Sequence, residues 1–112
     1  MRGAAREPQE PPAGTVTLDL SAGAITLRGE IDAALEPTLL DTLRAVEATP
    51  PGDPADLRVD AREVSFIDST GIKFLALLTQ RSGRPVLLVQ PSSHVRFVLD
   101  VTRISELVTV VD

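Results

Sequence analysis

The segment Asp68-Ser69-Thr70-Gly71 holds the residues of this chain best suited to a chemical role. It lies between an apolar stretch typical of a strand and one typical of a helix, where a short polar side chain is needed to satisfy free N–H groups. Helix capping alone is therefore one explanation of the segment. Phosphorylation of Ser69 is another, because a helix N-terminus offers unpaired N–H groups and the positive end of the helix dipole to a phosphoryl group.

A phosphoryl group on Ser69 would act on the surface of the domain rather than on its fold. It would add a charge of about −1.5 to −2 next to Asp68 and, we expect, near Asp32. The result would be a strongly negative patch that a docked partner must tolerate or leave. The residues alone leave both explanations, the helix cap and the phosphorylation site, open.

Residue patterns typical of enzymes do not fit the sequence. An aspartic protease motif has one residue between Asp and Gly, whereas two residues separate Asp68 from Gly71. A serine hydrolase needs a base for Ser69, and we expect the single histidine, His94, on the surface of a helix. One histidine without cysteine is a poor set of transition-metal ligands, and the acidic residues do not form a calcium loop. We therefore expect no enzyme activity, no metal and no cofactor.

Length and composition narrow the class of protein. A chain of 112 residues with 43% hydrophobic residues is typical of one globular domain. Its formal net charge of −5 disfavours direct binding to nucleic acid, which needs clustered Lys and Arg. Because the sequence has no apolar run long enough for a bilayer and no secretory signal pattern, we expect a cytoplasmic protein that does not bind a membrane.

The first half of the chain predicts a tail, two strands and a helix. Residues 1–14 are rich in proline and poor in large apolar residues, so we expect a disordered tail before a folded domain at residues 15–112. Apolar and polar residues alternate in residues 16–20 and 25–28, which predicts two strands joined by a hairpin turn. Apolar residues at helical spacing in residues 35–46 predict a helix.

The second half predicts three further strands with helices between them. In chain order we expect a strand at 57–61, a loop through Arg62 and Glu63, and a helix from Ser69 to about Gln80. A strand at 86–89, covered on both faces, follows. The chain then forms a helix and a last strand at 107–111, and the apolar face of that helix carries Val95, Val98, Leu99 and Phe97. Single helices between strands imply parallel pairing with right-handed crossovers. The predicted fold class is α/β, a mixed sheet in the order β-β-α-β-α-β-α-β with helices packed against it.

Two stretches of the sequence resemble the STAS domain, and within it the anti-sigma factor antagonist branch. Residues 27–32, Leu-Arg-Gly-Glu-Ile-Asp, are similar to the family's Gly-Glu-hydrophobic-Asp at the end of a strand. Residues 64–72, Val-Ser-Phe-Ile-Asp-Ser-Thr-Gly-Ile, are the more specific match and follow Val59-Asp60. Together with the order of elements, the resemblance extends over residues 15–112 and implies a STAS-like fold.

The resemblance implies a bacterial regulator of transcription that works by partner switching. Its unphosphorylated form would bind an anti-sigma factor that is itself a serine kinase, which releases a sigma factor. The kinase phosphorylates the serine directly after the motif aspartate, which matches Ser69, and a phosphatase acting on phosphoserine restores binding. The resemblance makes Ser69 a substrate residue and not a catalyst.

The resemblance also places a partner-binding surface around Ser69. Asp32 and Asp68 match aspartates that flank the serine in relatives, and we expect Thr70, Gly71 and Lys73 to contribute to the same surface. Thr70 stands where many relatives have a second serine, so its modification stays open, and Lys73 stands where a small residue is usual. A related STAS module that does not cycle phosphate is the alternative: an accessory subunit of an ABC-type lipid transporter, or a part of a stress-sensing scaffold.

Overall fold

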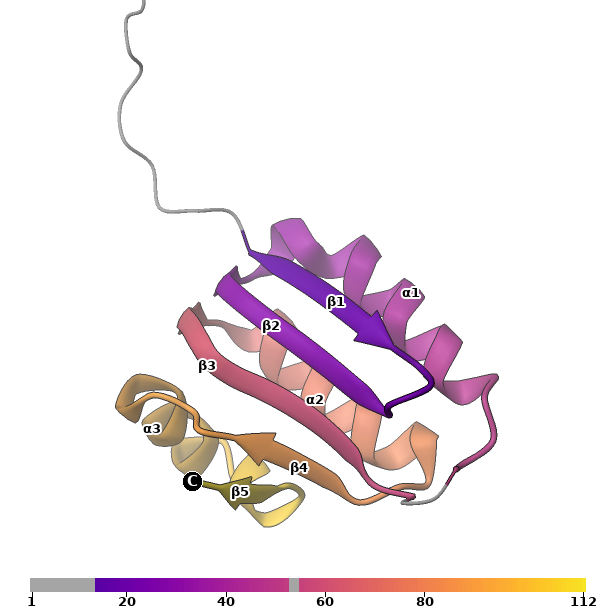
Figure 1. Ribbon diagram of the computed structural model, residues 1–112. Coiled ribbons are helices and arrows are strands. Elements are labelled where there is room, and N and C mark those ends of the chain that lie inside the picture. Colours follow the sequence, from indigo (N-terminus) through magenta and orange to yellow (C-terminus); the bar gives the residue numbers. More distant parts are fainter. Residues whose placement is uncertain (1–13, 53–54) are drawn as a thin grey trace, which may run out of the picture.

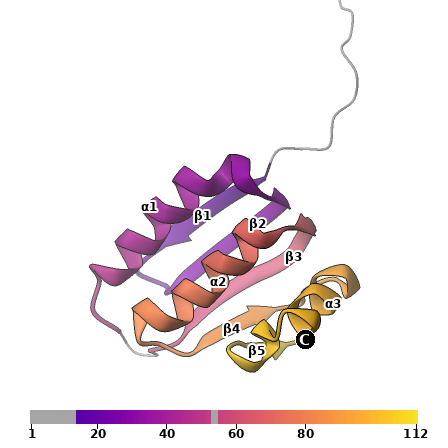
Figure 2. The ribbon, with the colours of Figure 1, turned by 180° about the vertical axis from the view of Figure 1, so that it is seen from behind.

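The computed structural model describes residues 14–52 and 55–112, so the predicted tail lies outside the described residues except for Gly14. Within these residues a five-stranded sheet carries three helices on one of its faces, and both views of the ribbon show this arrangement (Figures 1 and 2). The strands, in order across the sheet, are β1 (Thr15–Asp19), β2 (Ala24–Ile31), β3 (Leu57–Ile67), β4 (Val86–Val89) and β5 (Thr109–Val111). The helices are α1 (Glu36–Glu47), α2 (Ser69–Ser82) and α3 (Ser93–Val101), and the short 3-10 helices are η1 (Ala33–Leu35) and η2 (Ile104–Glu106).

Strand pairing follows the predicted mixed pattern. β1 and β2 pair antiparallel, and the pairs β2–β3, β3–β4 and β4–β5 are parallel. Gly23 ends the hairpin turn with φ +62°, a left-handed conformation that glycine adopts without strain. The α/β fold class and the order of strands and helices are confirmed.

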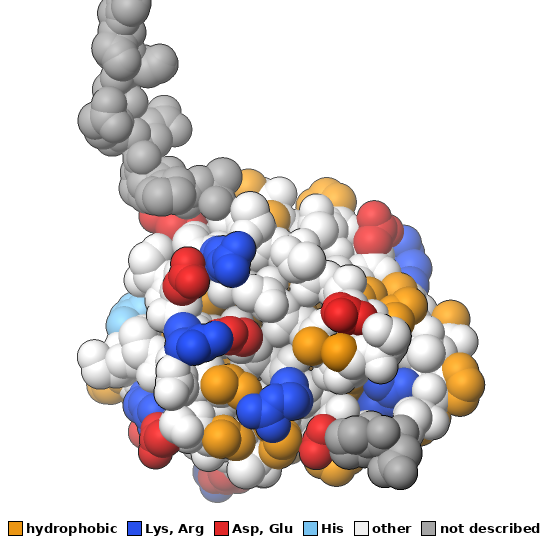
Figure 3. Space-filling view, in the orientation of Figure 1, with side chains coloured by type: hydrophobic (Ala, Val, Ile, Leu, Met, Phe, Trp, Pro, Cys, Tyr) orange, Lys and Arg blue, Asp and Glu red, His pale blue; other side chains and the backbone are white. Residues whose placement is uncertain are grey.

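The hydrophobic core lies between the sheet and its helices. β2 and β3 bury residues such as Ile25 and Val59 in this layer, and the helices add Leu43, Leu75 and Leu99. The other face of the sheet carries interspersed acidic and basic side chains, without a large area of one sign (Figure 3). The prediction that β4 is covered on both faces is therefore wrong: its residues are alternately buried and half-buried.

β3 is longer than predicted, because the residues expected to form a loop belong to the strand. Relative to β2 it gains a residue twice, between Asp60 and Glu63 and again between Val64 and Phe66. The first irregularity is held by Asp60, whose carboxylate accepts from the Arg62 backbone N–H at 3.0 Å and pairs with its guanidinium at 2.7 Å. Hydrogen bonding from Arg62 lowers the pKa of Asp60. Bulges break the alternation of buried and exposed residues, which is why the sequence pattern ends too early.

Three further details of the prediction are also wrong. Leu20 lies in the hairpin turn rather than in β1. The last strand begins at Thr109, because the N–H groups of Leu107 and Val108 still donate to the Ile104 carbonyl of η2. Phe97 does not join the core face of α3, since 64% of its surface is exposed, whereas Val95 and Leu99 are buried. No helix within the described residues has the length and apolar composition needed to cross a bilayer.

Candidate functional site

The two aspartates singled out in the sequence follow paired residues at the carboxyl ends of β2 and β3. Ile31 pairs with Ile67, and the Asp68 N–H donates to the Ile31 carbonyl at 3.2 Å. Asp32 and Asp68, each the next residue, therefore leave the sheet side by side. Parallel strands end at the same edge, so residues 36 positions apart in the sequence contribute to one surface.

Each aspartate caps the element that it precedes. The Asp32 carboxylate accepts from the Ala34 N–H at 3.1 Å at the start of η1. The Asp68 carboxylate accepts from the N–H groups of Thr70 at 2.8 Å and Gly71 at 3.4 Å at the start of α2. The predicted cap is thus made by the carboxylate of Asp68.

Ser69 is the first residue of α2 and its side chain is exposed. Because Asp68 supplies the cap, the Ser69 hydroxyl takes no part in the capping hydrogen bonds. A hydroxyl that does not stabilise the helix can be modified without a direct loss of structure. Its position at the positive end of the α2 dipole favours a negative group there.

Gly71 lies beneath this surface rather than on it. A Cβ atom at this position would lie 2.5 Å from Cγ1 of Ile67 and 2.9 Å from Cγ2 of Ile31, which is too close for either contact. The glycine therefore lets the first turn of α2 lie directly against the ends of β2 and β3. It was expected at the partner surface, and the structure places it among buried residues.

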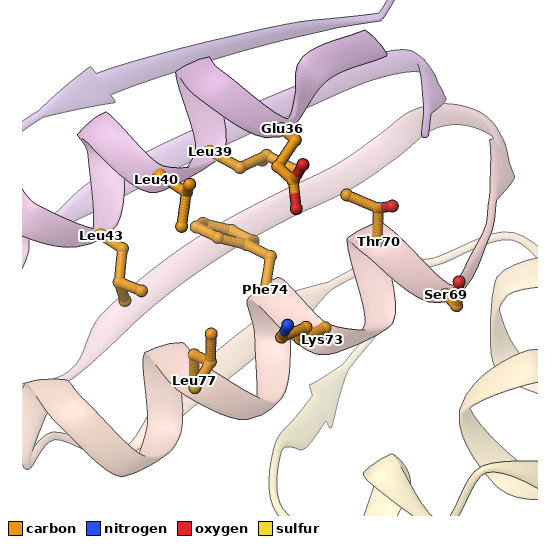
Figure 4. Close-up of a pocket in the computed structure, with 9 residues that line it drawn as sticks. All are labelled: Glu36, Leu39, Leu40, Leu43, Ser69, Thr70, Lys73, Phe74 and Leu77. Carbon is orange, nitrogen blue, oxygen red and sulfur yellow. The ribbon is translucent and has the colours of Figure 1, made fainter. Parts of the chain in front are cut away.

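Thr70 and Lys73 line a groove between α1 and α2, together with Ser69 at one end. The cavity has a volume of about 280 Å3. In Figure 4 the side chains of Thr70, Phe74 and Leu77 point from α2 toward α1, whereas Ser69 lies at the start of α2 and Lys73 lies along that helix. Its lining residues on α1 are Glu36, Leu39, Leu40 and Leu43, and on α2 they are Ser69, Thr70, Lys73, Phe74 and Leu77. Sequence reasoning missed Glu36 and the leucines. Leu40 was the available signal, because it is an apolar residue beside the core-facing stripe of α1.

His94 has no catalytic arrangement in the described residues. Its ring is exposed, as expected, and stacks on Phe66 with a centroid distance of 5.8 Å and an interplanar angle of 15°. In residues 14–52 and 55–112, no three His, Asp or Glu side chains are grouped so that they could hold a metal ion. The described site therefore presents the exposed hydroxyl of Ser69 beside the carboxylates of Asp68 and Asp32.

Comparison with known proteins gives a family and a fold. A family model described as "Mlab, STAS domain" matches residues 14–109. The chain is similar to the crystal structure of an anti-sigma factor antagonist from Mycobacterium paratuberculosis, with 24% identity, a TM-score of 0.67, and coverage of 88% of this chain and 85% of that one. It is also similar to the structure of the anti-sigma factor antagonist SpoIIAA in its unphosphorylated form, with 18% identity, a TM-score of 0.66, and 89% of each chain covered.

No protein of curated function matches the sequence. The likeness to the solved structures shows a shared fold, and the family model extends over most of the chain. Both agree with the order of elements and with the resemblance in residues 64–72. The chain therefore belongs to the STAS domain family.

Proposed function

We propose that this protein is an anti-sigma factor antagonist that is switched off by phosphorylation of Ser69. The carrying observation is that Ser69 presents an exposed hydroxyl at the start of α2 while the neighbouring Asp68 makes the cap. The two solved structures named above are both of anti-sigma factor antagonists, which supports the same role here.

In the proposed cycle the unphosphorylated protein binds an anti-sigma factor that is a serine kinase, in the cytoplasm and without direct contact to DNA. The Ser69 oxygen attacks the γ-phosphorus of ATP, and the bond from that phosphorus to the β,γ-bridging oxygen breaks, so that ADP leaves. The proton of the serine hydroxyl passes to a base of the kinase. A phosphatase later hydrolyses the phosphoserine with water. The protein supplies a substrate hydroxyl and a docking surface.

The charge around Ser69 explains how a phosphate would release the partner. Asp32 and Asp68 already place two carboxylates at this edge of the sheet. A docked partner would remove water from these carboxylates and the phosphate together, and burying like charges at an interface costs on the order of several kcal/mol. That is enough to change binding by more than a hundredfold, since about 1.4 kcal/mol corresponds to a factor of ten.

Phosphate mapping tests the proposal directly. The protein is incubated with serine-kinase anti-sigma factors from the same genome and ATP, and the modified residue is located by mass spectrometry. We expect phosphate on Ser69, its loss in Ser69→Ala, and no loss in Ser93→Ala. Ser93 is the matched control, because it is also exposed and also begins a helix. No phosphate on Ser69 with any of these kinases would overturn the proposal.

Binding measurements with the same anti-sigma factors test the switch itself. We expect Ser69→Ala to bind with the affinity of the unmodified protein and Ser69→Asp to lose at least tenfold, because only the second adds charge beside Asp68. Both variants should unfold at nearly the same temperature, since the Ser69 hydroxyl makes no cap. Equal affinity of the two variants would contradict the switch.

A STAS module that does not cycle phosphate is the second candidate. The observation in its favour is that the matching family model is described as "Mlab, STAS domain" and not as an antagonist. This candidate predicts binding to the ATPase of an ABC-type lipid transporter, or to a stress-sensing scaffold, that is the same for Ser69→Ala and the unmodified protein. It also predicts that kinases leave Ser69 unmodified.

A further inference from the structure

Lys73 is the unusual residue of the surface around Ser69. It is the only lysine of the chain, and it lies four residues after Ser69 on α2. Residues at this spacing are neighbours on one helix face, and an acidic group that precedes a lysine by four residues is the favourable orientation. Both residues are exposed, and both line the groove between α1 and α2 (Figure 4).

We propose that Lys73 is the counter-ion of phosphoserine 69 and determines where the phosphate lies in the switched-off state. This inference rests on the proposed function and specifies how its modified state is built. The unphosphorylated and phosphorylated forms then differ in the position of Lys73 as well as in the added phosphate. In the unphosphorylated form the Lys73 ammonium group is at the groove, and in the phosphorylated form it is at the start of α2.

The hydrogen bonds of α2 show why a phosphate needs a side-chain partner. The N–H groups of Thr70 and Gly71 already donate to the Asp68 carboxylate, and the Ile72 N–H donates to the Asp68 carbonyl at 3.0 Å. A phosphate on Ser69 therefore meets a helix start whose donors are largely in use and whose cap is itself negative. A nearby cation must offset that repulsion.

Lys73 is available for this role. The six ion pairs found among the described residues all use an arginine as the cation. The acidic residue that shares the groove with Lys73 is Glu36, at the start of α1. A phosphate that carries nearly two charges attracts the ammonium group more strongly than a single carboxylate at the same distance.

The pairing would change the groove as well as the helix start. When the ammonium group moves to the phosphate on Ser69, the Glu36 carboxylate remains in a groove otherwise lined by leucines, Phe74 and Thr70. A partner that inserts an apolar side chain beside Lys73 then meets a more acidic rim. Phosphorylation would thus alter the partner surface at two places from one modified atom.

Titration of the phosphate tests the pairing without a kinase. Phosphoserine is incorporated at position 69 during translation, and its second pKa, ordinarily about 6, is followed by 31P NMR. A lysine nearby stabilises the dianion and lowers this pKa, so Lys73→Gln should raise it by about 0.3 units and Lys73→Arg should leave it low. Arg81→Gln removes the same charge at the far end of α2, and it should shift the second pKa of phosphoserine 69 by less than about 0.1 units.

A second phosphoserine provides the matched control. At position 93 the residue four places later is Phe97, so the pKa of phosphoserine 93 should not respond to Lys73→Gln. The inference is overturned if Lys73→Gln and Arg81→Gln shift phosphoserine 69 equally, or if Lys73→Arg behaves like Lys73→Gln. Because the phosphate is incorporated during translation, these results are independent of the kinase assay. Absence of phosphate in that assay would contradict the proposed function alone.

Discussion

Helices α2 and α3 begin in similar ways and differ in what they present to a partner. Each follows a parallel strand, and each is capped by a polar side chain that is followed by an exposed serine. At α2 the cap is the carboxylate of Asp68, whereas at α3 it is the hydroxyl of Ser92, which accepts from the Val95 N–H at 3.3 Å. An exposed serine at a helix start is therefore common to both helices and identifies no site by itself.

The residues around each serine make the difference. Ser69 has the carboxylates of Asp68 and Asp32 at its edge of the sheet and Lys73 one turn later on α2. Ser93 follows a neutral cap, and Phe97 stands where α2 has its lysine. A phosphate would therefore join two carboxylates at α2, whereas at α3 its charged neighbour one turn later would be Arg96, which already pairs with Asp112. Charge context, rather than helix position, separates a candidate switch from a capped helix.

Replacement of Gly71 should have the largest effect on stability, because it tests how closely α2 approaches the sheet. The equivalent position of α3, three residues after the cap, is a buried valine, Val95. At Gly71 a single Cβ would overlap Ile67 and Ile31, so Gly71→Ala should lower the free energy of unfolding by about 1–3 kcal/mol. Urea denaturation measures this loss.

Gly52→Ala is the control for that measurement. An added Cβ there meets nothing within 4 Å, so it should change stability little. If Gly71→Ala were as stable as Gly52→Ala, the close contact between α2 and the strand ends would be wrong. The contrast with Val95 would then have no structural basis.

Removal of the two caps should have a smaller effect that is similar at both helices. Asp68→Ala and Ser92→Ala each delete a side-chain acceptor of backbone N–H groups, at a cost of about 1 kcal/mol. Their effects on partner binding should differ, since only Asp68 flanks Ser69. Isothermal titration with an anti-sigma factor measures binding, and urea denaturation measures stability. Equal loss of binding in the two variants would remove the distinction between the helices.

The sequence predicted the parts of this arrangement that depend on local patterns. The order of elements, the start of α2 at Ser69 and the two strand-end aspartates follow from periodicity, from the need for a helix cap and from the family motif. It could not predict the bulges of β3, because the Asp60–Arg62 hydrogen bonds that hold one of them interrupt the alternation used to recognise strands. Nor could it predict the groove, which exists only because α1 and α2 lie against each other.

The smallest expected effect on stability comes from Asp60, which lies in β3, one of the two strands that lead to α2 and α3. β3 reaches α2 through two register shifts, whereas β4, which leads to α3, pairs with β3 without one. The pKa of Asp60 is lowered by hydrogen bonding to Arg62, so its contribution to stability is present above the unfolded value of 3.8 and is lost as the pH falls through the folded pKa. Arg62 is largely exposed, which limits the contribution to about 1 kcal/mol or less.

Asp60→Asn tests this contribution through its pH dependence. At pH about 6 the variant should unfold at a lower urea concentration than the unmodified protein, and the difference should shrink as the pH falls below about 4. Asp19→Asn is the matched control, because the pKa of Asp19 is also lowered, by the Ser21 hydroxyl, but Asp19 lies in the hairpin at the other end of the sheet.

If the bulge helps to place Asp68, then Asp60→Asn should weaken partner binding slightly and Asp19→Asn should not. Identical binding of the two variants would mean that the register shifts of β3 are independent of the site.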